Sequence, residues 1–364
     1  MKIAFYGSSL LSSYWNGAAT YYRGLLRDLA GRGHDIAFYE PDAFDRQRHR
    51  DIEPPDWARV TVYPATQGGL AAVLAEAAAA DVVVKASGVG VFDEALLDGV
   101  IAHAAPHAIR IFWDVDAAAT LDEIRTDTSH PIRRALPELD LVLTYGGGAP
   151  VVDAYRTLGA RRCVPIYNAL DPTTHHPVPA DPRFAADLAF LGNRLPDREA
   201  RVDEFFLRAA ATAPDRRFLI GGNGWDDKAM PDNVRRLGHV STNDHNAFNS
   251  TPLAVLNIAR DSMAAIGFSP ATRVFEAAGA AACLITDAWD GLELFLKPEH
   301  EVLVARDGQD VAELVSGLTP ARARAIGAAA LARVRRDHSY ARRGAEVDAV
   351  LHEVQARRTA RSAA

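Results

Sequence analysis

The sequence predicts an α/β protein made of two Rossmann-like domains, each a parallel sheet covered by helices. Short apolar runs alternate with amphipathic or alanine-rich stretches, which is the pattern of strands joined by crossover helices. The alternation stops at a proline-rich segment, residues 170–183, and then begins again. A chain of 364 residues is long enough for two domains that each bury a core.

The first domain is predicted to span residues 1–170. Its apolar runs have the length of single strands, and the stretches between them have helical spacing. Such a series makes a complete doubly wound domain. The expected strands are Lys2–Tyr6, Asp35–Tyr39, Arg59–Tyr63, Asp81–Ala86, Ala108–Trp113, Leu139–Thr144 and Arg162–Tyr167, and the expected helices are Thr20–Ala30, Leu70–Ala79, Glu94–Ala104 and Val151–Leu158.

The second domain is predicted to span residues 171–338. It follows a linker at 170–183, where prolines disfavour regular structure because they lack an N–H donor and restrict the preceding residue. Residues 320–356 have helical spacing. The last helix is assigned to a separate segment, residues 339–364, and the end of the chain after Arg358 is expected to fray. The expected strands are Leu188–Gly192, Arg217–Gly221, Arg236–Val240, Leu253–Ile258, Ala282–Thr286 and Glu301–Ala305.

Composition and charge exclude several classes of protein. The net charge of −7, from 40 basic and 47 acidic side chains, gives no attraction to a polyanion, so no nucleic acid partner is expected. The N-terminus has no signal-peptide core and no apolar run reaches the length of a membrane span. Cys163 and Cys283 lie in apolar runs as free thiols, which favours a cytoplasmic protein. The oligomeric state is left open.

Ligands of open α/β sheets bind in the turns that follow the strands. Gly7 follows the first strand, but no G-x-G-x-x-G fingerprint accompanies it, which disfavours a nicotinamide enzyme. Lys85 and Ser87 follow the fourth strand, and Asp114 follows the fifth. Asp114 and Asp116 either cap the helix that begins near residue 117 or act on a substrate.

The turn that opens the second domain is suited to a diphosphate. Gly192 and Asn193 follow a strand, and Arg194 and Arg198 flank the next helix start. Guanidinium groups donate bidentately to phosphate oxygens, and a helix N-terminus adds partial positive charge. The alternative is an exposed helix start where Asp197 pairs with an arginine.

The most informative segment runs from Ser269 to Asp287. Ser269 and Pro270 are typical of a helix start. The helix then carries a single carboxylate, Glu276, among alanines and glycines, and one carboxylate in such a place can accept both hydroxyls of a ribose. The alternative is an intrahelical pair with Arg273, which contributes only about 0.2–0.5 kcal/mol.

These segments resemble the glycosyltransferases of the GT-B fold with a "glycosyl transferases group 1" C-terminal domain, particularly the bacterial spore-maturation-protein-like branch. The similarity is greatest in the C-terminal half. The segments that carry it are Phe190–Arg198, Leu237–Val240, Leu256–Asp287, Gly291–Phe295 and Glu301–Val304.

The resemblance implies a fold and an activity. The two domains would face each other across a cleft, with the acceptor on the first, the nucleotide sugar on the second, and the C-terminal helix crossing back to the first. The reaction would be a metal-independent, hexosyltransferase-type transfer from a nucleotide-diphosphate sugar, most frequently a UDP-sugar, to an unidentified acceptor, and it would need no cofactor.

The resemblance also implies roles for particular residues. Glu276 would bind the nucleotide ribose, and Arg194 and Arg198 would lie near the diphosphate. The base would contact the backbone at His239 and Val240. In the catalytic hypothesis, Arg194 and Arg273 stabilise the leaving group and Asp114 is the general base. The remaining expected donor-site residues are Gly192, Asn193, Arg260, Ser262, Thr272 and Arg273.

One departure affects sugar recognition. The larger retaining families place a second glutamate eight positions before the ribose glutamate, and here that position is Phe268. Sugar recognition is therefore assigned to Arg260, Ser262 and the facing loops of the first domain, and retention or inversion stays open. Two other functions share the fold: a sugar-nucleotide epimerase and a non-catalytic nucleotide-sugar-binding protein. No metal site is expected, because His175 and His176 lie in the linker without a third ligand nearby.

Overall fold

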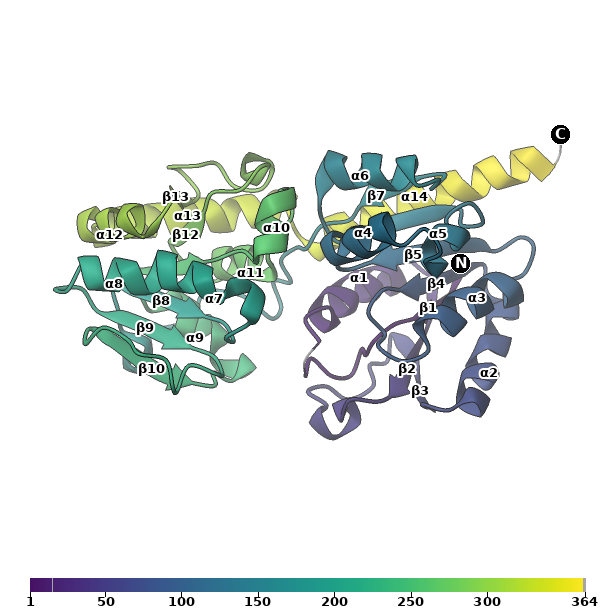
Figure 1. Ribbon diagram of the computed structural model, residues 1–364, viewed down its shortest axis with the longest axis horizontal. Helices are drawn as coiled ribbons and strands as arrows, with labels where there is room; N and C mark the ends of the chain where they lie inside the picture. Colours follow the sequence, from purple (N-terminus) through teal and green to yellow (C-terminus); the bar gives the residue numbers. More distant parts are fainter. Residues whose placement is uncertain (15, 363–364) are drawn as a thin grey trace. The chain divides into compact units, whose positions relative to one another are not determined.

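The computed structural model describes residues 1–14 and 16–362 and divides into two compact units. Unit 1 comprises Met1–Tyr167 and Tyr340–Ala364, and unit 2 comprises Asn168–Ser339. Each contains one sheet with helices on its faces (Figure 1). The expected α/β class with two Rossmann-like domains is confirmed.

The sheet of unit 1 has seven parallel strands in the order β3-β2-β1-β4-β5-β6-β7. Strand β1 pairs with β2 on one side and with β4 on the other, so the chain reverses its direction of winding there. The strands are β1 (Lys2–Tyr6), β2 (Asp35–Asp42), β3 (Ala58–Pro64), β4 (Val82–Ala86), β5 (Ile109–Asp114), β6 (Leu141–Thr144) and β7 (Cys163–Pro165). The α-helices are α1 (Ala19–Gly31), α2 (Gln67–Ala75), α3 (Asp93–His103), α4 (Ala117–Thr126), α5 (Pro131–Ala135), α6 (Gly148–Thr157) and α14 (Tyr340–Ser362).

Helix α14 packs closely on α1 within unit 1. A Cβ atom built on Gly24 of α1 would lie 2.2 Å from the ring of Tyr340, and one on Gly344 would lie 2.0 Å from a carboxylate oxygen of Asp28. The His34 ring also bonds Asp348 at 2.9 Å. The two glycines therefore permit this approach of the helix axes.

The sheet of unit 2 has six parallel strands in the order β10-β9-β8-β11-β12-β13. Here the winding reverses between β8 and β11. The strands are β8 (Leu188–Leu191), β9 (Phe218–Gly221), β10 (Val234–Gly238), β11 (Ala254–Asn257), β12 (Leu284–Asp287) and β13 (Leu303–Ala305). The α-helices are α7 (Pro196–Val202), α8 (Arg208–Thr212), α9 (His245–Ser250), α10 (Asp261–Ile266), α11 (Thr272–Gly279), α12 (Gly308–Gly317) and α13 (Pro320–Asp337).

The structure differs from the sequence expectation at one helix start. Helix α11 begins at Thr272, not at Ser269–Pro270. The reason is that Phe268 has a left-handed backbone (φ 50°), donates its N–H to the carbonyl of Asp290, and presses its ring against Gly291. These contacts hold residues 269–271, which lie between Phe268 and Thr272, out of the helix.

The ends of unit 2 also differ in detail from the expectation. The proline-rich segment packs onto unit 2, where the Leu170 N–H donates to the carbonyl of His338 at 2.8 Å. The C-terminal helical region is broken between α13 and α14, and α14 stays helical beyond Arg358 to Ser362. Residues 363–364, which were expected to fray, lie outside the described residues. Within the described chain, no helix is both long enough and apolar enough to cross a membrane.

Candidate functional site

The candidate site lies in unit 2, at the carboxyl ends of β8 and β11. Open α/β sheets bind ligands where the strand order reverses, and these two strands are the neighbours at that point. The turn after β8 leads into α7, and the turn after β11 leads through α10 to α11. The segments named from the sequence for nucleotide binding thus converge on one edge of the sheet.

The turn after β8 is fixed by the turn after β9. The Trp225 indole N–H donates to the carbonyl of Gly192 at 2.7 Å, and the Asn223 N–H donates to Asn193 Oδ1 at 2.9 Å. Gly222 has φ 116°, and a Cβ atom there would lie 2.2 Å from the Gly192 carbonyl oxygen. Gly192 and Asn193 therefore shape the backbone, and the Asn193 side chain is engaged within the fold.

Two arginines lie beside this turn and form no ion pair with a carboxylate of the described residues. Arg198 donates from Nη2 to the carbonyl of Asn193 at 2.6 Å, while its Nε is buried and bonds none of the described residues. Burial and the positive charges of Arg273 and Arg260 together lower the pKa of Arg198 to about 10, although the carboxylate of Asp197 opposes this shift. Burial also lowers the pKa of Arg273, whose guanidinium has no hydrogen bond or ion pair within the described chain. Such a pair is a site for an anion.

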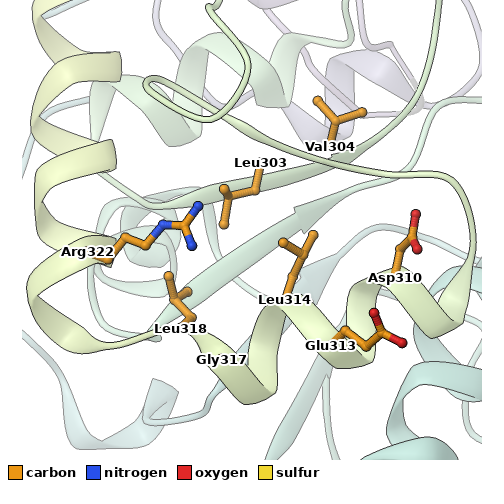
Figure 2. A pocket seen from close by; sticks show the side chains of 8 residues that line it. All are labelled: Leu303, Val304, Asp310, Glu313, Leu314, Gly317, Leu318 and Arg322. Carbon is orange, nitrogen blue, oxygen red and sulfur yellow. The ribbon is translucent and has the colours of Figure 1, made fainter.

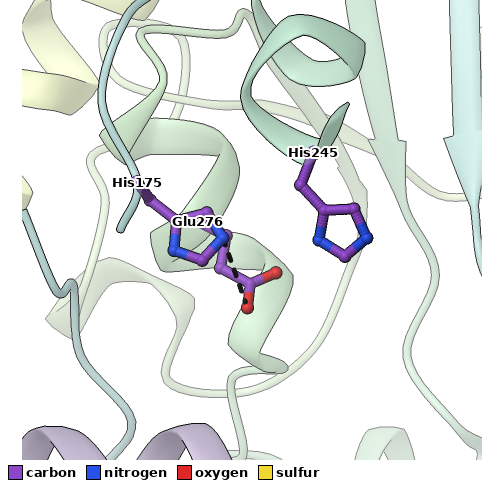
Figure 3. Close-up of side chains that lie close together, drawn as sticks. All are labelled: His175, His245 and Glu276. Atoms are coloured by element: carbon purple, nitrogen blue, oxygen red, sulfur yellow. Dashed lines mark ion pairs between the residues drawn. The ribbon is translucent and has the colours of Figure 1, made fainter. Parts of the chain in front are cut away.

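Glu276 follows Arg273 by one turn of α11 and lies between two histidines (Figure 3). Its Oε1 is 3.9 Å from Nε2 of His175, and the nearest atoms of His175, His245 and Glu276 all lie within 4.8 Å of one another. The expectation that His175 is linker surface without a third ligand nearby is wrong. His175 is only 8% exposed, because Asn246 fastens the proline-rich segment by accepting from the His176 N–H and donating to the carbonyl of Thr174.

Other residues named from the sequence are paired elsewhere. Arg194, expected near the diphosphate, bonds Glu199 at 2.7 Å and Asp227 at 2.9 Å, so its charge is already balanced. Arg260 forms an ion pair with Asp197, the partner that the alternative interpretation assigned to an arginine of this region.

The remaining donor-site candidates divide by accessibility. Ser262 Oγ is buried and bonds none of the described residues, which leaves it able to bind a ligand hydroxyl. Thr272 is partly exposed at the first turn of α11, His239 is exposed, and Val240 is buried.

Sequence reasoning missed the buried polar group that holds the turn after β11. Asp287 is fully buried at the end of β12 and bonds Arg201 at 2.6 Å and the Ala259 N–H at 3.1 Å. Burial raises the pKa of Asp287, although Arg201 opposes this shift. The only local signal was a carboxylate at the end of an apolar run.

In unit 1, the polar residues proposed for acceptor chemistry are engaged within the fold. Asp114 is fully buried and accepts from Tyr155 at 2.5 Å, Thr120 at 3.0 Å and the Asp116 N–H at 3.0 Å. Lys85 is buried and pairs with Asp93 at 2.6 Å. This geometry favours the structural alternative for Asp114, which ties the start of α4 to β5, and does not support its role as general base.

A separate hollow in unit 2 lies between β13, α12 and the start of α13 (Figure 2). Its volume is about 250 Å³. Two of its charged residues are paired, since Asp310 bonds Arg306 at 2.6 Å and Arg322 bonds Glu299 at 2.8 Å, and Glu313 accepts from Gln309 at 2.8 Å. It includes none of the arginines or the glutamate described above. The lining residues are Leu303, Val304, Asp310, Glu313, Leu314, Gly317, Leu318 and Arg322.

Comparison with known proteins agrees with this location. Residues 198–349 match a protein family described as "Glycosyl transferase-like". The chain therefore has the GT-B fold, and its second half is similar to this family. The matched region contains Arg198, Arg273 and Glu276, and the expected resemblance to GT-B glycosyltransferases is confirmed. No comparison tests the spore-maturation-protein-like branch, which stays a prediction, and no curated protein matches the chain.

Solved structures share the fold over nearly the whole chain. Sucrose-phosphate synthase from Thermosynechococcus elongatus has a TM-score of 0.70 at 14% identity, covering 98% of this chain and 99% of that one. Anabaena HepE in complex with UDP and glucose has a TM-score of 0.66 at 13% identity, covering 97% and 100%. T4 phage BGT in complex with UDP-glucose has a TM-score of 0.57 at 12% identity, covering 98% and 97%. At these identities the likeness shows the GT-B fold.

Proposed function

We propose that unit 2 binds a nucleoside-diphosphate sugar and that the protein transfers the sugar to an acceptor. The observation that carries this proposal is the Arg198–Arg273 pair, two partly buried guanidinium groups that form no ion pair with any described carboxylate. Arg273 lies one helical turn before Glu276 on α11. The family match supports it, since the matched region contains all three residues. Two proteins of the same fold were crystallised with UDP-glucose, which makes a UDP-sugar the first donor to test.

The arginine pair suits the charge that develops when the sugar leaves. Cleavage of the bond between the anomeric carbon and the diphosphate places additional negative charge on the departing phosphate oxygens. Arg198 and Arg273 supply two positive charges at fixed positions, and charge-assisted hydrogen bonds to phosphate are stronger than neutral ones. We therefore propose a transfer in which these guanidinium groups, rather than a metal ion, balance the leaving group. Arg194 is left out of this role because its charge is paired.

Glu276 suits the ribose. An ionised carboxylate only accepts hydrogen bonds, so it can take one from each hydroxyl of a cis diol. The side chain is 15% exposed, which leaves a face for a ligand while limiting competition from water. Ser262 and Arg260 remain the proposed contacts of the sugar, and Thr272 completes the donor site. The base is proposed to contact the backbone at His239 and Val240.

The first experiment measures nucleotide binding by calorimetry. We expect UDP and a UDP-sugar to bind, and Glu276→Ala to reduce the affinity at least about tenfold, because each lost hydrogen bond to a charged group costs about 1.5–3 kcal/mol. Glu293→Ala is the matched control, since Glu293 is an exposed glutamate of the same unit. Unchanged binding by Glu276→Ala would remove the site assignment. GDP- and dTDP-sugars in the same assay identify the base.

The second experiment separates transfer from its alternatives. Incubation of the bound donor with candidate acceptors should yield a glycosylated product and free nucleotide diphosphate. An altered nucleotide sugar formed without any acceptor would instead indicate an epimerase. The acceptor is proposed to bind unit 1, and no residue there is assigned as the base.

A further inference from the structure

We propose that His175, His245 and Glu276 form a binding site for a divalent transition-metal ion, with Zn²⁺ as the probe. The three side chains come from the proline-rich segment, the start of α9 and the middle of α11. They converge within unit 2, with the Glu276 carboxylate between the two rings (Figure 3). Nothing in the family match or in the proposed transfer reaction requires two imidazoles at this carboxylate.

The distances suit a tetrahedral ion after small side-chain rotations. Zn²⁺ binds histidine nitrogen and carboxylate oxygen at about 2.0–2.1 Å, which places adjacent ligand atoms about 3.3 Å apart in a tetrahedron. His175 Nε2 and Glu276 Oε1 are already 3.9 Å apart, and one donor atom from each of the three residues lies within 4.8 Å of the other two. Three protein ligands leave a fourth position for water, as in zinc sites that remain open.

A hydrogen bond behind one ring orients that ligand. Nδ1 of His175 lies 3.0 Å from Thr174 Oγ1, so a proton on Nδ1 leaves the lone pair of Nε2 facing Glu276. The His175 side chain is therefore supported by a contact of the fold.

The donor set selects the kind of cation. Ca²⁺ and Mg²⁺ prefer oxygen ligands, whereas two imidazoles and a single carboxylate suit Zn²⁺ and its neighbours in the first transition row. The positive charge of Arg273, one turn away on α11, further disfavours a cation held by charge alone.

Metal and nucleotide would compete for Glu276. If Glu276 binds the ribose, as proposed above, its carboxylate cannot serve both ligands at once. The metal site itself rests on the three side chains alone, whereas this consequence rests also on the proposed function. Zn²⁺ would then act as a competitor of the donor, not as a participant in the transfer.

The test is metal binding by the full-length, tag-free protein after chelator treatment. Titration with Co²⁺ should give the strong visible absorption of a low-coordinate site, and Zn²⁺ should displace one Co²⁺ per chain. His175→Gln, His245→Ala and Glu276→Gln should each lower the Zn²⁺ affinity at least about tenfold. His176→Ala is the matched control, because His176 neighbours His175 in sequence but lies outside the cluster.

Several results would overturn the site. These are no Co²⁺ band, wild-type affinity in folded His175→Gln and His245→Ala proteins, or an equal loss in His176→Ala. Both histidine variants are measured in case His175→Gln misfolds. His245 is less buried than His175, so His245→Ala should disturb the fold less.

Competition is measured separately with uridine, which has the ribose but no phosphates to chelate Zn²⁺. Zn²⁺ binding without any uridine or UDP binding would reject the proposed function while keeping the metal site. Nucleotide binding without Zn²⁺ binding would reject the metal site while keeping the proposed function.

Discussion

Arg198 and Arg194 are four residues apart, yet their surroundings give them opposite roles. Arg194 is balanced by Glu199 and Asp227, whereas Arg198 has a buried Nε that bonds none of the residues described and lies near the positive charge of Arg273. An unpaired buried cation is stabilised by a bound anion, while a paired one gains less. The two side chains therefore allow a paired and an unpaired arginine of one short segment to be compared.

Arg198→Gln should weaken UDP binding by about 10- to 100-fold, the loss expected for one or two charge-assisted hydrogen bonds. Its uridine affinity should stay near the wild-type value, because uridine lacks the phosphates. Arg194→Gln is the control and should change UDP affinity much less. Calorimetry with both ligands measures these differences. Equal losses in the two variants would show that Arg198 holds no phosphate.

Asp114 offers a test of stability against pH. Asp114→Asn should lower the melting temperature, because one amide oxygen cannot replace two carboxylate oxygens that accept from Tyr155, Thr120 and the Asp116 N–H, and a lost buried hydrogen bond costs about 1–3 kcal/mol. Burial raises the pKa of Asp114, although its hydrogen bonds oppose this.

The sign of the pH dependence follows from that raised pKa. A carboxyl group that binds its proton more tightly in the folded chain stabilises the fold at low pH, and this contribution is lost as the pH rises through its folded-state pKa. The melting-temperature difference between wild type and Asp114→Asn should therefore shrink from pH 5 to pH 8. A difference that grows over this range would mean that the folded protein favours the ionised carboxylate.

The sequence predicted the residues of the site better than their partners. Glu276 and Arg273 could be found because they are the only charges on a short, otherwise nearly apolar helix. The pairing of Arg194 with Asp227 and the approach of His245 to His175 could not, because each joins residues far apart in sequence. Asp227 lies 33 positions from Arg194, and His245 lies 70 positions from His175, so no local spacing marks either contact.

At the scale of elements, the strands were predictable and the helix starts less so. Most strands are short apolar runs, and periodicity alone finds them, with ends that differ by a few residues. The start of α11 depends on Phe268, whose ring meets Gly291 and whose N–H bonds Asp290. Contacts with a segment more than 20 residues away override the local preference of Ser269–Pro270 for a helix start.

The packing of α1 on α14 predicts an unusual response to alanine. In an exposed helix interior, replacing glycine by alanine gains about 1 kcal/mol. At Gly24 the new Cβ would lie 2.2 Å from the buried Tyr340 ring, and such overpacking costs about 1–3 kcal/mol. Gly24→Ala should therefore lower the melting temperature of the protein.

The matched control is Gly31→Ala in the last turn of α1. No atom lies within 4 Å of a Cβ at Gly31, so the melting temperature should stay unchanged or rise. A stabilised Gly24→Ala protein would show that the two helices are not held at this separation.

At the scale of the whole molecule, the residues proposed for nucleotide binding all belong to unit 2. The chain enters and leaves this unit at adjacent positions, where Leu170 pairs with Ser339 and bonds His338. Arg198, Arg273 and Glu276 all lie between these ends. Unit 2 therefore has the properties of a domain that could be separated by one cut at each end.

A fragment of residues 168–339 should fold and bind UDP with an affinity within about threefold of the full chain, a difference below about 1 kcal/mol. It should not transfer sugar, because unit 1, the proposed location of the acceptor, is missing. Circular dichroism and calorimetry check folding and binding, and the same fragment with Glu276→Gln is the control, which should stay folded and lose affinity. A folded fragment that fails to bind UDP would mean that unit 1 contributes essential donor contacts. In that case the buried arginine pair alone would not account for nucleotide affinity.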